Sequence, residues 1–191
     1  MRNRPGRHRR IRIDRRHAIA WALTAALLIL PCPLSGTHGA NVELHVKAAY
    51  LFNFGRYVSW PQQTGDVVVG VLGHDPIVEV LEKTVSGKTI NGRAYRVKSF
   101  APSETIDHCD ILYIPNLQAR KLAPILGAVA GHPILTVSDL EGFTNDGGMI
   151  EFLLVDDTLK FNISLSAAEK SGLKISSELL RVAHEIKGRR R

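Results

Sequence analysis

The amino-acid sequence predicts an α/β domain whose mixed sheet is parallel at its centre and antiparallel at one edge. Short apolar runs rich in β-branched residues, each bounded by turn residues, are typical of strands buried on both faces of a parallel sheet. Helical patterns separate these runs in the β-α-β order that right-handed crossovers produce. Further on, two apolar segments flank Asp156-Asp157-Thr158, and this composition predicts a β-hairpin.

Residues 1–40 are expected to be a signal peptide, and residues 41–191 a single domain. Residues 1–17 are strongly basic, and the thirteen residues at 18–30 are apolar. A bilayer-spanning helix needs about 20 apolar residues, so a cleaved secretory signal peptide is favoured over an uncleaved anchor. Small residues place the cleavage between positions 36 and 40. The remaining chain is long enough for one substantial core.

Removing the leader changes the charge of the chain. Eight of the 25 basic residues and one of the 18 acidic residues lie within residues 1–40, so the domain holds 17 of each. A formally neutral domain lacks the electrostatic footprint of a nucleic-acid-binding protein. Cys32 leaves with the leader, so Cys109 has no partner for an internal disulfide. We expect it to be a buried apolar filler, with a free thiol as the alternative.

The first element of the domain is an aromatic helix within residues 46–61, VKAAYLFNFGRYVSWP. Tyr50, Phe54 and Tyr57 fall at i, i+4 and i+7, and apolar residues cover most of the circumference, which predicts burial. The helix is expected to end at Pro61, because a proline pushes the residue before it out of the helical conformation. Core packing is one interpretation. A dimer or partner surface is the other, because Tyr50, Tyr57 and Trp60 each carry a polar group that suits an interface.

The central elements follow in β-α-β order. Their predicted bounds are strands at 67–72, 95–100, 110–114 and 134–137, with helices at 76–84 and 117–130, and hairpin strands at 149–155 and 159–165.

Two helices are predicted after the hairpin. Ser166 and Glu169 have the spacing of a capping box, and Gly172 supplies a left-handed stop. A second helix is predicted over 176–187. Its apolar stripe comprises Leu179, Val182, Ala183 and Ile186.

Polar residues follow three of the predicted parallel strands. Because the carboxyl ends of such strands share one edge, these residues could bind a small polar ligand there. The alternative is structural, with helix capping after two strands and a turn after the third. The residues of this strand-end edge are His74, Asp75, Asn116, Ser138 and Asp139.

The sequence contains no recognisable catalytic or metal-binding motif. HExxH, CxxC, GxSxG, GxGxxG and the phosphate-binding loop are all missing, and the histidines lack the spacing of metal ligands. Adjacent side chains on a strand point to opposite faces, so His108 and Cys109 are not expected to form a local dyad. These observations favour a non-enzymatic binding domain without a cofactor.

Several motifs resemble those of the YfiR family, over about residues 46–183. They are KAAYLFNFGRYVSWP, HCDILYI, ILTVSDLEGF and NDGGMIEFLLVDDTLKFNISLSAAEKSGLKISSELLRVA. The resemblance implies a periplasmic, Rossmann-like three-layer domain that forms homodimers and has no catalytic activity. It also implies repression of an inner-membrane diguanylate cyclase through that enzyme's periplasmic region, with control of cyclic di-GMP and biofilm formation. An outer-membrane lipoprotein that sequesters the repressor is a further implication.

The AAEKSGLKIS motif carries the implied partner contacts. By this resemblance Glu169 and Ile175 contact the partner, and Leu173 and Arg181 are neighbours by position. The alternative places Leu173 and Ile175 in the core. Relatives join the Cys109 position to a cysteine near Val71, but the strand VVVGVLG has none, so no disulfide is expected. A periplasmic sensor that binds a small ligand at the strand-end edge is the alternative function.

Overall fold

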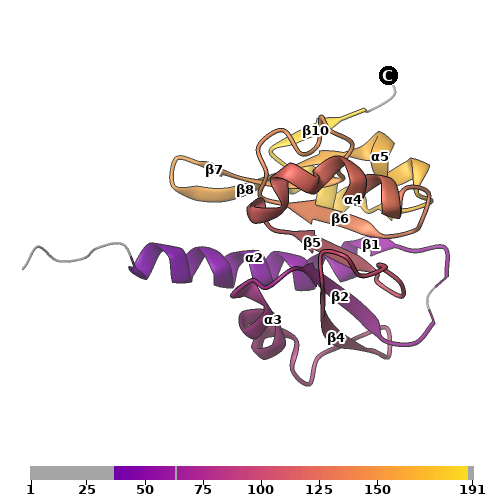
Figure 1. Ribbon diagram of the computed structural model, residues 1–191, viewed down its shortest axis with the longest axis horizontal. Coiled ribbons are helices and arrows are strands. Elements are labelled where there is room, and N and C mark those ends of the chain that lie inside the picture. The colour runs from indigo at the N-terminus through magenta and orange to yellow at the C-terminus, as the bar shows by residue number, and fades with distance from the viewer. Residues whose placement is uncertain (1–36, 63, 189–191) are drawn as a thin grey trace, which may run out of the picture. The chain divides into compact units, whose positions relative to one another are not determined.

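The computed structural model describes residues 37–62 and 64–188, so the predicted signal peptide lies outside the described residues. Within this part of the chain, eight strands form one sheet in the order β10-β8-β7-β6-β5-β2-β4-β3 (Figure 1). Their bounds are β2 Val67–Leu72, β3 Thr89–Ile90, β4 Arg93–Phe100, β5 Ile111–Ile114, β6 Leu135–Ser138, β7 Ile150–Val155, β8 Thr158–Ser164 and β10 Glu185–Lys187.

The pairing confirms the predicted α/β fold with a mixed sheet. Strands β4, β2, β5, β6 and β7 run parallel, whereas β8 pairs antiparallel with β7 as the second strand of the hairpin. Strand β4 lies on one side of β2, and β5 lies on the other. The strand order therefore reverses at β2 and β5, and such a switch point opens a crevice at the carboxyl ends of the strands.

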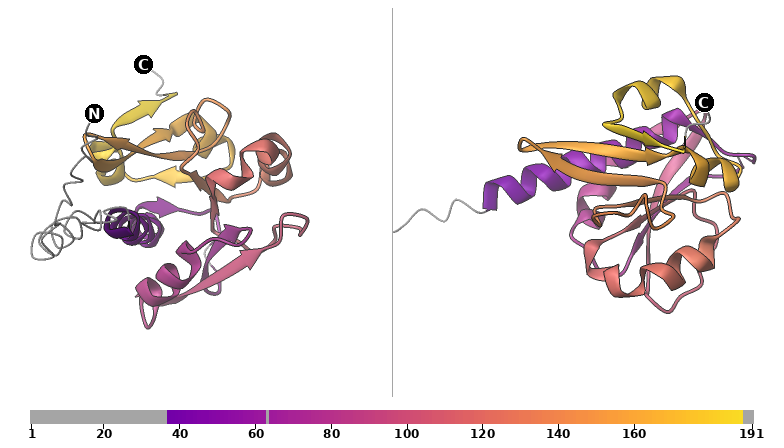
Figure 2. Two further views of the ribbon diagram at one scale, coloured as in Figure 1. Left: turned by 60° about the vertical axis from the view of Figure 1, so that its left-hand side comes forward. Right: turned by 90° about the horizontal axis from the view of Figure 1, so that it is seen from above.

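Helices cover both faces of the sheet and make three layers (Figure 2). Residues Ile111 and Tyr113 of β5 join the core beneath α2 and α3, whereas Leu112 and Ile114 join a second core beneath α4. This alternation is the period of two expected of a strand buried on both sides. The helices are α2 Thr37–Tyr57, α3 Ile77–Val85, the 3-10 helix η1 Asn116–Lys121, α4 Leu122–Val129, α5 Leu165–Lys170 and α6 Ser177–Val182. None of these described helices is long and apolar enough to cross a bilayer.

The aromatic helix α2 packs in the larger core. Phe54 is fully buried, and its ring lies 6.0 Å from that of Phe152 and 5.5 Å from that of Phe161. Tyr50 packs against the same two rings. The helix ends at Tyr57, earlier than predicted, because the next two residues form strand β1, Val58–Ser59, paired antiparallel with β9, Lys174–Ile175.

The helix predicted over 117–130 is divided into η1 and α4. Pro124 lies in the first turn of α4. Proline has no backbone N–H, so it is tolerated in the first turn of an α-helix, where an N–H would have no intrahelical acceptor. An α-helix that contains Pro124 therefore has to begin within a few residues before it.

The C-terminal predictions need two corrections. The capping box is wrong, because Ser166 lies inside α5 and Ser164 occupies the N-cap position. The backbone N–H of Ser164 still donates to the Met149 carbonyl at 2.8 Å, so the helix begins directly where strand pairing ends. Gly172, at φ 75°, ends α5 as predicted.

The second correction concerns the last predicted helix. It ends at Val182 instead of residue 187, and β10 follows it and pairs parallel with β8. Without β10, the backbone groups of β8 would form an unpaired edge, so strand pairing is favoured over five more helical residues. Val182 is 67% exposed, which shows that the predicted apolar stripe does not continue to this point.

Candidate functional site

The residues implied as partner contacts lie on three consecutive elements. Glu169 is exposed on α5, Arg181 is exposed on α6, and Ile175 is half-buried on β9 between them. We refer to Glu169, Ile175 and Arg181 as the C-terminal surface. Leu173 differs, because it is only 1% exposed and belongs to the larger core. Its side chain lies beneath the surface, where the core interpretation places it.

The two-stranded ribbon of β1 and β9 holds Ile175 in place. Val58 pairs with Ile175, and the backbone N–H of Ser176 donates to the Tyr57 carbonyl at 2.8 Å. Ser176 also caps α6, since its Oγ accepts a hydrogen bond from the Leu179 N–H at 3.2 Å. The end of α2 therefore fixes the position of the C-terminal surface.

The three aromatic residues singled out from the sequence do not form one surface. Tyr50 packs with the core rings, and its hydroxyl lies 3.5 Å from the Leu159 carbonyl. Tyr57 is half-buried beside the ribbon. Trp60 is 7% exposed, and its Nε1 donates to the Asp110 carbonyl at 3.1 Å. Core packing thus accounts for the middle of α2 and for Trp60.

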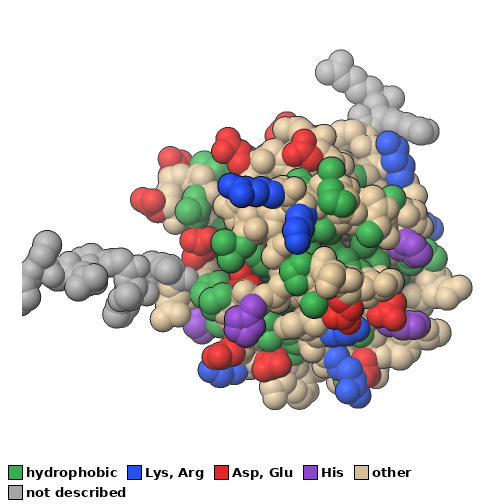
Figure 3. All heavy atoms as spheres, in the orientation of Figure 1, with side chains coloured by type: hydrophobic (Ala, Val, Ile, Leu, Met, Phe, Trp, Pro, Cys, Tyr) green, Lys and Arg blue, Asp and Glu red, His purple; other side chains and the backbone are tan. Residues whose placement is uncertain are grey.

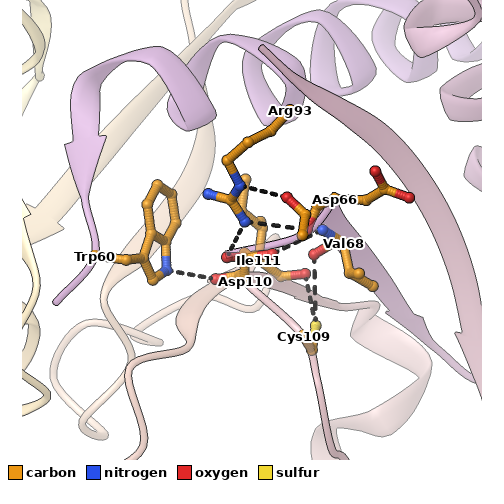
Figure 4. Close-up of polar contacts among 8 residues, drawn as sticks. Trp60, Asp66, Val68, Arg93, Cys109, Asp110 and Ile111 are labelled. Atoms are coloured by element: carbon orange, nitrogen blue, oxygen red, sulfur yellow. Dashed lines mark hydrogen bonds and ion pairs between the residues drawn. The ribbon is translucent and has the colours of Figure 1, made fainter. Parts of the chain in front are cut away.

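A buried ion pair lies beneath the segment that follows the ribbon (Figure 4). The Arg93 Nη2 is 3.2 Å from the Asp110 Oδ1, and both side chains are largely buried. Arg93 also donates to the carbonyls of Gly65, at 2.8 Å, and Asp66, at 3.0 Å. The other oxygen of Asp110 accepts the Val68 N–H at 2.8 Å. Together with Trp60, this network ties the segment after β1 to strands β2, β4 and β5.

The strand-end edge uses most of its polar groups internally. The Asp75 carboxylate accepts the N–H of Ile77 at 2.9 Å, at the start of α3. The Ser138 hydroxyl donates to the Ile114 carbonyl at 2.6 Å and accepts the Leu140 N–H at 3.1 Å. His74 is exposed beside Asp75. The turn at Ser138 is as the structural interpretation predicts, whereas Pro76, not Asp75, occupies the N-cap position of α3.

Asn116 and Asp139 instead line a cleft of about 590 Å³. The Asp139 carboxylate accepts the Asn116 backbone N–H at 3.0 Å, so Asn116 is not a side-chain cap. The second oxygen of Asp139 is 2.7 Å from Nζ of Lys47, which also pairs with Glu43 at 2.6 Å. Lys47 is 6% exposed. Sequence reasoning missed Lys47, because nothing local indicates that α2 crosses the end of β6.

The environment of Lys47 keeps it charged. Burial alone would lower the pKa of its ammonium. The hydrogen bonds and attraction of Asp139 and Glu43 outweigh burial, so the pKa of Lys47 lies above its ordinary value. Lys47 is therefore fully paired, and this cluster of one cation and two carboxylates keeps a net negative charge.

Glu151 of β7 lines the cleft and holds the loop that follows β6. It is buried and accepts the Gly142 N–H at 3.0 Å, the Thr144 N–H at 3.0 Å and the Thr144 hydroxyl at 2.7 Å. Burial alone would raise the pKa of this carboxyl, but the hydrogen bonds from Thr144 and Gly142 place it below its ordinary value. The loop is thus held by an ionised carboxylate.

This arrangement predicts a specific loss of stability in acid. The stability that Glu151 contributes is fully present above its unfolded pKa of about 4.3, and is lost as pH falls through its lower folded pKa. Glu151→Gln should lower the free energy of unfolding by about 1.5–3 kcal/mol at pH 7 and weaken its dependence on pH below about 5. Urea unfolding of both proteins at several pH values measures this. Equal acid sensitivity in the two would contradict the assignment.

Cys109 is a buried filler, as expected. Its Sγ lies 3.0 Å from the Ile111 carbonyl, and burial raises the pKa of the thiol to about 12, far from that of a nucleophile. A Cβ added to Gly70 would lie 2.7 Å from this sulfur. The strand position that faces Cys109 is therefore Gly70, next to Val71.

Comparison with known proteins identifies the family. A model of the family described as YfiR/HmsC-like matches residues 44–184. The match begins in α2, spans the sheet through β8 and includes every residue of the C-terminal surface. Members of this family are periplasmic regulators of diguanylate cyclases, with a regulatory and not a catalytic role. The chain belongs to the YfiR/HmsC-like family.

Proposed function

We propose that this protein is a periplasmic repressor that binds the periplasmic region of an inner-membrane diguanylate cyclase. Binding lowers cyclic di-GMP and thereby limits biofilm formation. The observation that carries the proposal is the family match, which spans the whole C-terminal surface.

The C-terminal surface has the chemistry of a protein contact. Ile175 supplies a partly exposed apolar side chain, and Glu169 and Arg181 supply opposite charges that are exposed to water. Protein interfaces combine an apolar centre with a polar rim in this way, and the rim charges contribute more to orientation than to affinity. The buried Leu173 and the β1–β9 ribbon hold this surface in one conformation, which reduces the entropy lost on binding.

A deletion experiment in the source bacterium tests the proposal. Deleting the gene should raise intracellular cyclic di-GMP, and restoring it should return the level to normal. Complementation with Glu169→Arg should restore repression only in part, whereas Glu82→Arg, a matched charge reversal on the exposed side of α3, should restore it fully. An unchanged cyclic di-GMP level on deletion, across several growth conditions, would refute the repressor function.

The proposal extends to assembly. We include the homodimer and the sequestering outer-membrane lipoprotein that the family resemblance implies. A lipoprotein that relieves repression should compete with the cyclase for the C-terminal surface. Adding it to a preformed complex of repressor and cyclase region should release the cyclase region.

A small-ligand sensor is the second candidate function. The cleft of about 590 Å³ at Asn116 and Asp139 favours it, because clefts at this edge of a parallel sheet are common ligand sites. A ligand at about 100 times its Kd would stabilise the protein by about 2.7 kcal/mol, which a thermal-shift screen with polar metabolites would detect. A screen without any stabilising compound would exclude the compounds tested as ligands.

A further inference from the structure

A second surface lies at the other end of α2. The first turns of this helix and the β7–β8 hairpin project side by side from the rest of the domain (Figure 1), and between them lies a groove of about 730 Å³. Val42, Val46 and Tyr50 of α2 form one side, and Leu154 and Leu159 of the hairpin form the other. We call this the hairpin groove. Val42 and Tyr57 are fifteen residues apart, about 22 Å along a helix, so the groove is distinct from the C-terminal surface.

The hairpin groove exposes apolar side chains that the fold does not cover. Val42 is 61% exposed and Leu154 is 59% exposed. Val42, Val46 and Tyr50 recur every four residues, so they continue outward the helical face that packs Phe54 into the core. A contiguous apolar surface of this kind is typical of an interaction site.

The border of the groove is acidic. Glu43 and Asp157 line it, and Asp139, Glu141 and Glu151 line the adjoining cleft. Among the described residues that line either, the one cation is Lys47, which is buried and already paired with Glu43 and Asp139. Figure 3 shows acidic and apolar side chains next to one another at this end of the molecule.

The hairpin turn adds an independent observation. Asp156 and Asp157 both have positive φ, 49° and 56°. A two-residue turn of this type is most easily formed by Asn-Gly, and non-glycine residues in this region are strained. Asp tolerates this conformation better than most residues with a side chain, but less well than Gly, so two carboxylates are permitted at the tip of the hairpin without being the residues of lowest strain. Asp157 lines the groove, and its charge at that border gives a reason for its presence in the turn.

We infer that the hairpin groove is a second docking site, whose occupant is a basic amphipathic helix of a partner protein. The apolar face of such a helix would cover Val42, Val46 and Leu154, and its Lys or Arg residues would face Glu43 and Asp157. This is the helix-in-groove mode of recognition, with anchors at i, i+3 or i+4, and i+7. Because the groove and the C-terminal surface lie at opposite ends of α2, one molecule can hold two segments at once.

A pair of synthetic peptides tests the inference. One is a helical peptide of about 18 residues with leucines on one face and lysines on the other, and its counterpart has glutamate in place of every lysine. Fluorescence anisotropy with the protein purified from the periplasm measures the binding of each. We expect the lysine peptide to bind at least about tenfold more tightly, with an affinity that falls as salt rises.

Variants locate the binding. Val42→Ser combined with Leu154→Ser should weaken binding of the lysine peptide by at least about tenfold, and Asp157→Asn should reduce the salt dependence. The matched control is Leu117→Ser, because Leu117 is 83% exposed but lies outside the groove and should leave the affinity unchanged. The side chains at 42 and 154 are largely exposed, so circular dichroism should show an unchanged fold.

Three results would overturn the inference. The first is equal binding of the two peptides, and the second is an equal loss of affinity in Leu117→Ser. The third is a sedimentation measurement in which the groove variants convert a dimer to a monomer while the lysine peptide does not bind. That result would assign the groove to a second copy of the chain.

Discussion

Replacing Asp110 with alanine is expected to lower the free energy of unfolding by about 3–5 kcal/mol, the cost of removing one partner of a buried ion pair. Without Asp110, the Arg93 guanidinium stays buried with two carbonyl contacts but no carboxylate, and the Val68 N–H loses its acceptor. Urea unfolding followed by circular dichroism measures the change. In a domain of this size, the midpoint of thermal unfolding should fall by about 10 °C.

The control for Asp110→Ala is Asp66→Ala, on the same side of the sheet. Asp66 pairs with Arg96, whose side chain is 74% exposed, and such surface pairs contribute about 0–1 kcal/mol. The backbone carbonyl of Asp66, which accepts from Arg93, is unchanged by this substitution. A loss in Asp110→Ala no larger than that in Asp66→Ala would show that burial does not strengthen the Arg93–Asp110 pair.

The central sheet could be predicted from the sequence because its strands are buried on both faces. Burial selects continuous runs of Val, Ile and Leu, and the strand predicted at 67–72 has the same bounds as β2. Strand β5 begins one residue later than predicted, at Ile111, because Asp110 turns its carboxylate back to the Val68 N–H and to Arg93. Local composition thus located the core elements but not the polar residues that end them.

The C-terminal elements could not be predicted in the same way. Glu185–Lys187 contains no run that distinguishes a short strand from a last helical turn, and its conformation depends on pairing with β8 more than twenty residues earlier in the chain. The same limit applies to β1 and β9, two residues each, which pair across more than a hundred positions. Long-range pairing overrides weak local preference in such short segments.

The candidate sites could not be predicted either, because they too are formed by residues that are distant in the sequence. Lys47 meets Asp139 across 92 positions, and Arg93 meets Asp110 across 17. Leu173 and Ile175 are both apolar and only two residues apart, so composition could not decide which faces the core. The structure places Leu173 beneath the surface and leaves Ile175 half-exposed.

Ile175→Asp is expected to abolish binding to the periplasmic region of the cyclase. Central apolar residues of an interface often contribute 2 kcal/mol or more, so we expect the Kd to rise by at least about thirtyfold. The aspartate replaces the apolar centre between Glu169 and Arg181 with a charge that must lose its hydration in the complex. Isothermal titration calorimetry with the purified cyclase region measures the change. Arg181→Glu, on the exposed rim, should weaken binding less and mainly slow association.

Ile175 also packs partly against the larger core, so a loss of binding has to be separated from a loss of folding. The matched variant is Ile90→Asp. Ile90 is partly buried against the same core and lies on a two-residue strand, β3, at the far edge of the sheet. Both variants should lose similar stability, but only Ile175→Asp should lose binding to the cyclase region.

Equal weakening of binding by both variants would mean that binding follows global stability. Unfolding of Ile175→Asp alone would mean that Ile175 belongs to the core, and the contact would then have to be made by Glu169 and Arg181 alone.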